Sequence, residues 1–202
     1  MQIDITIIIK CKIEINNALE AYRQHSLGVS REVNFLLSTC RLNLSKSIVL
    51  IETLDDSQTI ETTSIPATYI ALPDGSYAIC YIKNLNNCWK RFVLCKELFH
   101  VLLDNPEYAN IELINHIEHC TSEAPDLGPT PASAQIEFFA EYSAMEFLFP
   151  FEERLKIKEA SSDLDFAKIA ETYKVPRIYV ERYLTDSMIN VAKIIKGLPD
   201  SL

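Results

Sequence analysis

The sequence predicts an α+β fold, because a central stretch has the pattern of β-strands and two later stretches have the pattern of helices. Residues 47–54, 60–72 and 76–83 are β-branched or alternating runs between turn signals, so each is a predicted strand. Residues 91–104 are apolar on almost every side, which predicts a buried helix, and residues 135–149 form a second predicted helix. A chain of 202 residues is long enough to bury the core of one such domain.

The N-terminal region adds further elements. Its first fifteen residues alternate between isoleucine or cysteine and mostly polar side chains, which predicts a long, half-buried strand. Asn16 and Asn17 are predicted caps of a helix over residues 18–24. A further helix is predicted from residue 30 to about residue 41, and Pro-Asp-Gly at residues 73–75 predicts a tight turn before the last strand.

The region between the two main helices is predicted to hold a short helix over residues 111–119 and a loop over residues 121–132, which is rich in proline, serine and glycine. A loop of this length often forms one wall of a binding site. We expect one domain over residues 1–150 and a C-terminal helical segment over residues 151–202 that packs on it.

The C-terminal segment contains two predicted short helices over residues 166–184, which look like a helix-turn-helix. Residues 152–200 carry nine basic and nine acidic side chains, so their net charge is zero. A DNA-binding surface needs an excess of positive charge. We therefore expect this segment to pack against the preceding helices rather than to bind DNA.

Composition narrows the classes of function. A formal net charge of −9 argues against a sequence-independent nucleic-acid binder and is compatible with docking of a basic partner. No apolar run reaches the length needed to span a membrane, and the N-terminus lacks the pattern of a signal peptide. The six cysteines form no CxxC pair, so we expect reduced, buried thiols and a cytoplasmic protein.

Three polar side chains mark the first buried helix. Lys96, Glu97 and His100 form its narrow polar seam, because residues three and four apart lie on the same helix face. With histidine in place of Lys96, the string KELFH would read HELFH, an HExxH zinc-protease helix. In that motif two histidines hold zinc and the glutamate activates a water molecule.

The two main helices together resemble the paired motif of the ImmA/IrrE family of metallopeptidases (the IrrE N-terminal-like domain). Family members typically carry R-F-x-x-A-H-E-L-x-H-x-L-L and then E-x-x-A-N-x-F-A-x-x-L-L-M-P. The matching residues here are Arg91, Phe92, Glu97, Leu98, His100, Leu102 and Leu103, followed by Glu137, Ala140, Ala144, Leu148 and Pro150. The departures include Cys95 for the small residue, Lys96 for the first histidine, Phe99 for a glycine that is usual there, Glu141 for asparagine and Ser143 for phenylalanine.

This resemblance implies a zincin-like helical domain with a small antiparallel sheet packed on the motif helix. It also implies roles for individual residues. Glu97 matches the catalytic general base, while His100 and Glu137 match two of the three zinc ligands. Lys96 stands where the first ligand histidine is expected, and Glu141, one turn after Glu137, is a candidate contact of the ligand Glu137.

Two alternatives are open for the cofactor. In the first, His116, His119 or Cys120 replaces the missing ligand and the chain binds zinc. In the second, the ammonium group of Lys96 replaces the charge of zinc, pairs with Glu137 and also approaches Glu97. The second follows from the chemistry of lysine, since a protonated amine has no lone pair for a metal.

The two alternatives lead to different functions. With a lysine-filled site, the chain is a non-catalytic relative that regulates or binds a protein partner. With an atypical zinc site, it is an active metallo-endopeptidase that cleaves a helix-turn-helix repressor, as family members do when genes of a mobile element are released. A purely structural role of Lys96 is a third hypothesis. A protein partner, with a helix-turn-helix repressor as the candidate, is expected; direct contact with nucleic acid or membrane is not.

Overall fold

The computed structural model describes residues 5–25, 31–44, 47–53, 67–103, 132–160 and 163–199. Within these residues the chain is a mixed α+β protein with eight helices and one three-stranded sheet. The helices are α1 (Ile5–His25), α2 (Val33–Leu44), α3 (Asn87–Leu103), α5 (Ala132–Leu148), α6 (Phe151–Ala160), α7 (Phe166–Tyr173), α8 (Arg177–Tyr183) and α9 (Asp186–Gly197). The strands are β1 (Ile48–Thr53), β2 (Ala67–Ala71) and β3 (Tyr77–Ile82).

The sheet is mixed, with the strand order β1-β3-β2. β2 and β3 form the predicted antiparallel hairpin, whose turn contains Gly75 at a φ of 78°. β1 pairs with β3 in parallel, so the prediction of a wholly antiparallel sheet is wrong. The reason is that β3, with the almost continuously apolar sequence YAICYI, takes the central place: one of its edges pairs with β2 in the hairpin, and the other edge is left to β1.

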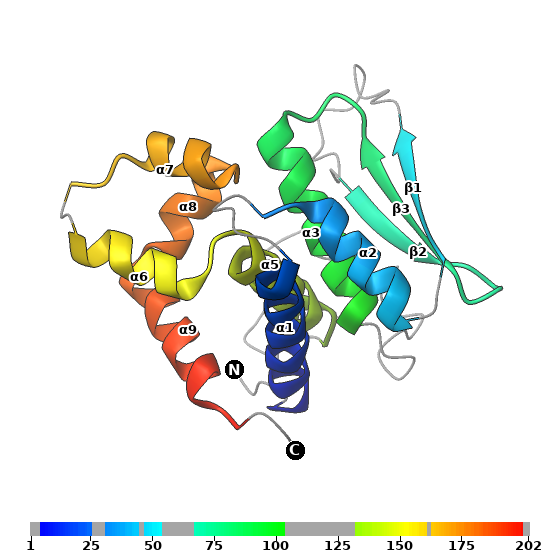
Figure 1. The fold of residues 1–202 in the computed structure, drawn as a ribbon, viewed down its shortest axis with the longest axis horizontal. Coiled ribbons are helices and arrows are strands. Elements are labelled where there is room, and N and C mark those ends of the chain that lie inside the picture. The colour runs from blue at the N-terminus through cyan, green and yellow to red at the C-terminus, as the bar shows by residue number, and fades with distance from the viewer. Residues whose placement is uncertain are drawn as a thin grey trace, which may run out of the picture.

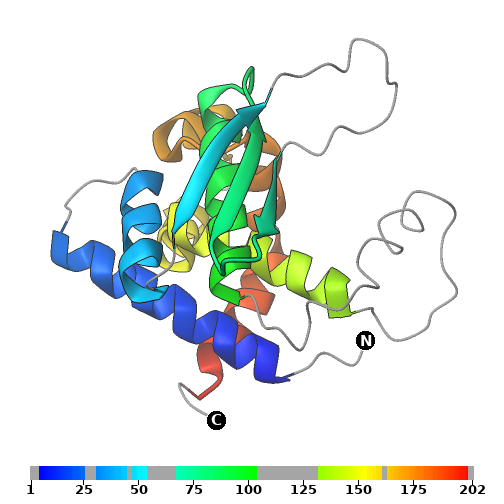
Figure 2. The same ribbon diagram turned by 90° about the vertical axis from the view of Figure 1, so that its right-hand side faces the viewer.

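Helix α3 lies between the sheet and α5 (Figures 1 and 2). One side of α3 contacts β2 and β3, and α2 packs beside it. Its opposite side packs along α5, which in turn contacts α1. Helices α6 to α9 form the part of the molecule farthest from the sheet (Figure 1). None of the helices that the structure describes has both the length and the apolar character needed to cross a bilayer.

The predicted N-terminal strand is wrong for residues 5–15, which belong to helix α1. Residues on its buried side recur every three or four positions: Ile15, Ala18, Leu19 and Tyr22 continue a stripe that begins at Cys11. Isoleucine also occurs at every second position, which is the pattern of a strand. Packing against α5 outweighs the weak preference of isoleucine for strands, so the segment is helical. Asn16 and Asn17 are therefore exposed residues within a helix rather than caps.

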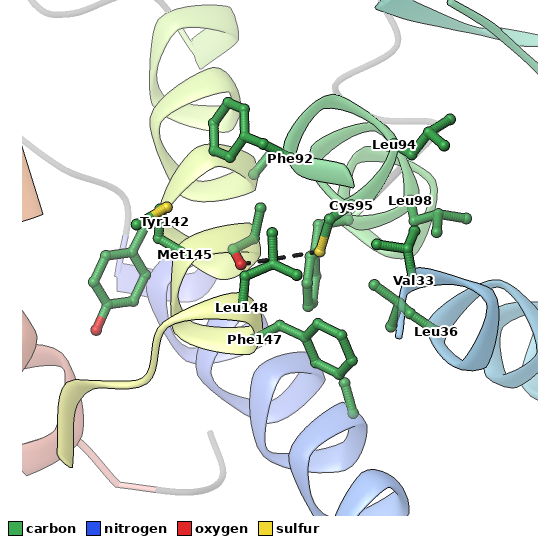
Figure 3. Close-up of a cluster of buried hydrophobic side chains, with 14 of the residues drawn as sticks. Val33, Leu36, Phe92, Leu94, Cys95, Leu98, Tyr142, Met145, Phe147 and Leu148 are labelled. Atoms are coloured by element: carbon green, nitrogen blue, oxygen red, sulfur yellow. Dashed lines mark hydrogen bonds between the residues drawn. The ribbon is translucent and has the colours of Figure 1, made fainter. Parts of the chain in front are cut away.

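The core joins α3 to α5 and α2 (Figure 3). The thiol of Cys95 donates to the carbonyl oxygen of Ala144 at 3.9 Å, directly between the two main helices. Burial raises the pKa of Cys95 well above its ordinary value, so this thiol stays protonated and acts as a small apolar side chain. The fully buried residues of the cluster include Leu36, Phe99, Met145, Phe147 and Leu148.

The C-terminal segment contains the two predicted short helices, α7 and α8, and two further helices, α6 and α9. Asp165 caps α7 by accepting a hydrogen bond from the backbone N–H of Lys168. Lys174 ends α7 in the left-handed conformation, at a φ of 50°. Tyr173 and Tyr183 are buried, and the ring of Tyr179 on α8 stacks on Phe92 of α3 with a centroid distance of 3.9 Å.

Several predictions fall outside the described residues. These are the helix at residues 111–119, most of the loop at residues 121–132, and the candidate replacement ligands His116, His119 and Cys120.

A buried ion pair joins α5 to α6. Glu146 on α5 contacts the guanidinium group of Arg154 on α6, and both side chains are almost completely excluded from solvent. The ring of Tyr183 lies 5.4 Å from the guanidinium carbon, and the backbone N–H of Phe151 donates to Glu146 at 3.2 Å. Burial lowers the pKa of Arg154 to about 10, which still leaves it charged at neutral pH.

The variant Glu146→Leu should therefore destabilise the protein by about 3 to 5 kcal/mol, because it leaves a buried, uncompensated positive charge. The double variant Glu146→Leu/Arg154→Met should recover most of that loss. Chemical denaturation measures both free energies of unfolding. As a control, Glu181→Ala removes the exposed pair with Arg177 and should cost less than about 1 kcal/mol. Equal losses in Glu146→Leu and Glu181→Ala would contradict a structural role for the buried pair.

Candidate functional site

The polar seam of α3 faces α5 on one side and β2 on the other. Lys96, Glu97 and His100 lie on this seam, and the nearest charged side chain on α5 is Glu137. From β2, the ring of Tyr69 stacks on His100 with a centroid distance of 5.4 Å and an angle of 14°. The structure thus brings together four of the five site residues expected from the sequence.

Lys96 contacts both carboxylates of the cluster. Its Nζ lies 2.7 Å from Oε2 of Glu137 and 3.7 Å from Oε1 of Glu97. The side chain of Lys96 is only 22% exposed. Burial by itself lowers the pKa of this amine, but the charges of Glu137 and Glu97 outweigh burial and raise the pKa above its ordinary value. Lys96 is therefore a protonated, positively charged group at neutral pH.

Glu97 is the buried carboxylate of the cluster, with 5% of its side chain exposed. Burial raises its pKa above the ordinary value, while the nearby His100, the ammonium group of Lys96 and a backbone hydrogen bond from Tyr69 oppose that rise. A carboxylate in this setting depends on a nearby cation for its charged form. Lys96 supplies that charge at the ion-pair distance of 3.7 Å rather than at hydrogen-bonding distance.

His100 is almost completely buried beneath Tyr69. Its Nε2 lies 3.0 Å from Oε1 of Glu137, but neither ring nitrogen makes a hydrogen bond of good geometry to any residue that the structure describes. The close approach to Glu137 thus falls short of an aligned hydrogen bond. An imidazole held in this way points at the same carboxylate as Lys96.

Glu137 is the most exposed member of the cluster, with 58% of its side chain accessible. Partial burial raises its pKa, but the contact with His100 and the contact with the ammonium group of Lys96 outweigh that effect and lower the pKa to about 2. Of the two carboxylates that Lys96 contacts, Glu97 is enclosed and Glu137 is largely open to solvent.

Among the residues that the structure describes, the arrangement does not supply the three protein ligands of the implied zinc site. Two of the implied ligands, His100 and Glu137, lie together. The third position belongs to Lys96, whose ammonium group already contacts Glu137 and offers no lone pair. Across the residues that the structure describes, no three side chains of histidine, cysteine, aspartate or glutamate are grouped so that they could hold a metal.

Glu141 faces away from the cluster centre and toward α8. Its Oε1 accepts a hydrogen bond from the hydroxyl of Tyr183 at 3.0 Å and lies 3.0 Å from Nη1 of Arg182. Its charge reaches Lys96 only as a minor contribution to the raised pKa of that amine. Glu141 thus ties α5 to the C-terminal helices, which differs from the expected contact with Glu137.

Arg91, the first residue of the motif, positions α3. Its guanidinium donates to the backbone carbonyl oxygens of Arg31 and Lys174, so it ties α3 both to the start of α2 and to the turn between α7 and α8. The side chain is almost buried.

Sequence reasoning missed Tyr69. The alternation along β2 places Ala67, Tyr69 and Ala71 on one face, and their register with buried Tyr77, Ile79 and Tyr81 shows that this face points to α3. The alternation was visible in the sequence, but the register that aligns Tyr69 with His100 was not.

No family model matches the chain, and no curated protein matches its sequence at a significant level. Function is therefore inferred from the geometry of the Lys96, Glu97, His100 and Glu137 cluster together with the resemblance of the two motif helices.

The ion pair predicts a pH-dependent contribution to stability. A carboxyl group whose pKa falls on folding stabilises the protein above its ordinary pKa, and this contribution is lost as the pH falls from about 4.5 to about 2. The variant Lys96→Met removes one of the groups that lower the pKa of Glu137. It should cost at least about 1 kcal/mol at pH 7, because solvent screens the exposed carboxylate of Glu137 but buried Glu97 also loses its nearby cation, and the cost should shrink toward pH 2.

Urea denaturation of chelator-treated protein at pH 7, 5 and 3 measures this difference. Lys156→Met, which removes an exposed lysine paired with Glu153, is the control and should change stability little at every pH. A loss in Lys96→Met that stays constant from pH 7 to pH 3 would contradict a charge interaction with Glu137.

Proposed function

We propose that this chain is an ImmA/IrrE-like protein whose zinc-protease site is disabled, and that it acts as a non-catalytic regulatory or partner-binding relative. The observation that carries the proposal is the 2.7 Å contact between Lys96 and Glu137 at the position where the family resemblance calls for a metal and its ligand. The lysine supplies a positive charge in place of the metal. Glu97 then has no metal-bound water to activate.

The retained acidic residues support a site that keeps its shape without catalysis. Glu97 and Glu137 carry negative charge that needs compensation, and a single ammonium group between them provides it. His100 stays packed beneath Tyr69. The proposed partner is a protein, with a helix-turn-helix repressor as the candidate, because the relatives that the motif resembles act on such repressors. A cytoplasmic location is part of the same proposal.

One observation favours the alternative, an active metallo-endopeptidase with an atypical metal site. His100 is a buried imidazole whose two nitrogens lack a well-aligned partner among the described residues, and such a group is a ready metal ligand. In that case a ligand other than Lys96 completes the set. Metal content separates the two functions directly.

Protein purified without chelator should contain no stoichiometric zinc, and the variant Lys96→His should bind about one zinc per chain, because it restores the implied donor set with His100 and Glu137. Elemental analysis measures both. Zinc added to Lys96→His should raise its melting temperature, since a ligand that binds only the folded state stabilises it. The same addition should leave the wild type unchanged.

Lys90→His is the matched control, because Lys90 is also on α3 but pairs with Glu52 rather than with Glu137. This variant should gain no zinc. About one zinc per chain in the wild-type protein would overturn the proposal in favour of the metallo-endopeptidase. Absence of zinc from both the wild type and Lys96→His would show that the position of Lys96 is not equivalent to a ligand position.

A further inference from the structure

The outer face of the sheet is apolar and exposed. Tyr69 on β2 and Ile79 on β3 point inward to α3, so their neighbours along each strand point away from the helices. Figure 2 shows the described helices gathered on one side of the sheet. The apolar side chains on the other side, named here the outer sheet face, are Val49, Ile51, Ile70, Leu72, Cys80 and Ile82.

Exposure on this face is high along β1 and β2, whereas Ala78 on the central strand β3 is buried. Among the described residues, six large hydrophobic side chains are exposed, and four of them belong to the outer sheet face: Val49 (48%), Ile51 (41%), Ile70 (46%) and Leu72 (37%). Scattered apolar residues on a surface need no explanation, but a contiguous group indicates an interaction site. The register makes the group contiguous, because Val49 and Ile70 flank Ala78 on the two sides of β3.

The strand sequences also fit a sheet that is covered on both faces. The pair β1 and β3 is parallel, and parallel strands are normally buried on both sides. A strand that faces water on one side usually carries polar residues there. The outward positions of β1, β2 and β3 include threonines but no charged side chain.

The area of the outer sheet face indicates what kind of partner can cover it. Three strands of about six residues cover an area of roughly 14 Å by 20 Å. A stable dimer buries about 800 Å² on each partner, so contact between two copies through this face alone is too small. One helix is about 10 Å wide and rises 1.5 Å per residue, so a helix of roughly 13 residues matches the face.

The charge of the chain indicates the polar side of that helix. A net charge of −9 attracts a positively charged partner and repels a negative one. We propose that the outer sheet face docks one amphipathic helix of a partner protein, with an apolar stripe against Val49, Ile51 and Ile70 and lysine or arginine on its other sides. Residues at every third or fourth position of the helix form the stripe.

This inference goes beyond the proposed function and does not depend on the chemistry of the Lys96 cluster. The cluster lies on the inner side of the sheet with α3, whereas the docking face lies on the outer side. Zinc in the wild-type protein would overturn the proposed function and leave the docking face unaffected. Conversely, failure of the peptide experiment below would leave the metal experiment unaffected.

The test uses the full chain and a synthetic 14-residue peptide with leucines at helical spacing, lysines on the opposite side and a fluorescein label. Fluorescence anisotropy measures binding. The variant Ile51→Thr/Ile70→Thr makes the face polar while keeping residues that suit strands. It should weaken binding by about tenfold or more, because two apolar contacts are lost. The matched control, Ile178→Thr/Ile194→Thr, changes two exposed isoleucines on α8 and α9 and should bind like the wild type.

A second readout needs no variant and covers the case in which the sheet variant fails to fold. Cys80 on the outer face and Cys88 on α3 are both partly exposed free thiols. The peptide should slow alkylation of Cys80 by iodoacetamide, read by mass spectrometry, and leave alkylation of Cys88 unchanged.

Three results would overturn the proposal. One is equal binding of a peptide with the same composition but scattered leucines, which would show attraction by charge alone. Another is equal protection of Cys80 and Cys88. The third is a dimer in sedimentation velocity that Ile51→Thr/Ile70→Thr dissociates, which would assign the face to a second copy of the chain.

Discussion

The burial of α3 is the constraint on which the rest of the structure depends. With the sheet on one side and α5 on the other, this helix leaves one narrow seam for polar side chains. Lys96, Glu97 and His100 all occupy that seam, so their charges must be balanced by groups on neighbouring elements. Glu137 from α5 and Tyr69 from β2 meet them there because the helix packing and the sheet register bring α5 and β2 to the same part of α3.

A lysine side chain differs from a metal ion in its charge and in the number of groups that it can contact. An ammonium group carries one positive charge and binds through directed N–H donors, whereas a divalent ion gathers several lone pairs around itself. Lys96 accordingly makes one close contact, with Glu137, and a longer one with Glu97. Burial raises the pKa of Glu97, whereas the contacts of the more exposed Glu137 with His100 and Lys96 lower its pKa to about 2.

Much of the centre of this fold was predictable, because buried helices and turn residues leave clear patterns. The hairpin around Gly75, the helix that carries Lys96 and the helix that carries Glu137 all lie where the sequence places them. The N-terminal helix was not predictable from its isoleucines, since alternation and a helical stripe share Cys11 and Ile15 and only contact with α5 decides between them. The parallel pairing of β1 and the position of Tyr69 depend on long-range register, which local periodicity does not contain.

Strand β2 contributes to both sides of the sheet through adjacent residues. Tyr69 stacks on His100, and Ile70, the next residue along the chain, points outward. Side chains alternate strictly along a strand, so a slip of one residue relative to β3 would exchange the two faces. An insertion of a single residue in the turn at Gly75 would therefore place an isoleucine over the imidazole and a tyrosine in solvent at the same time. The length of this hairpin turn thus fixes two positions at once, that of Tyr69 over His100 and that of Ile70 on the outer side of the sheet.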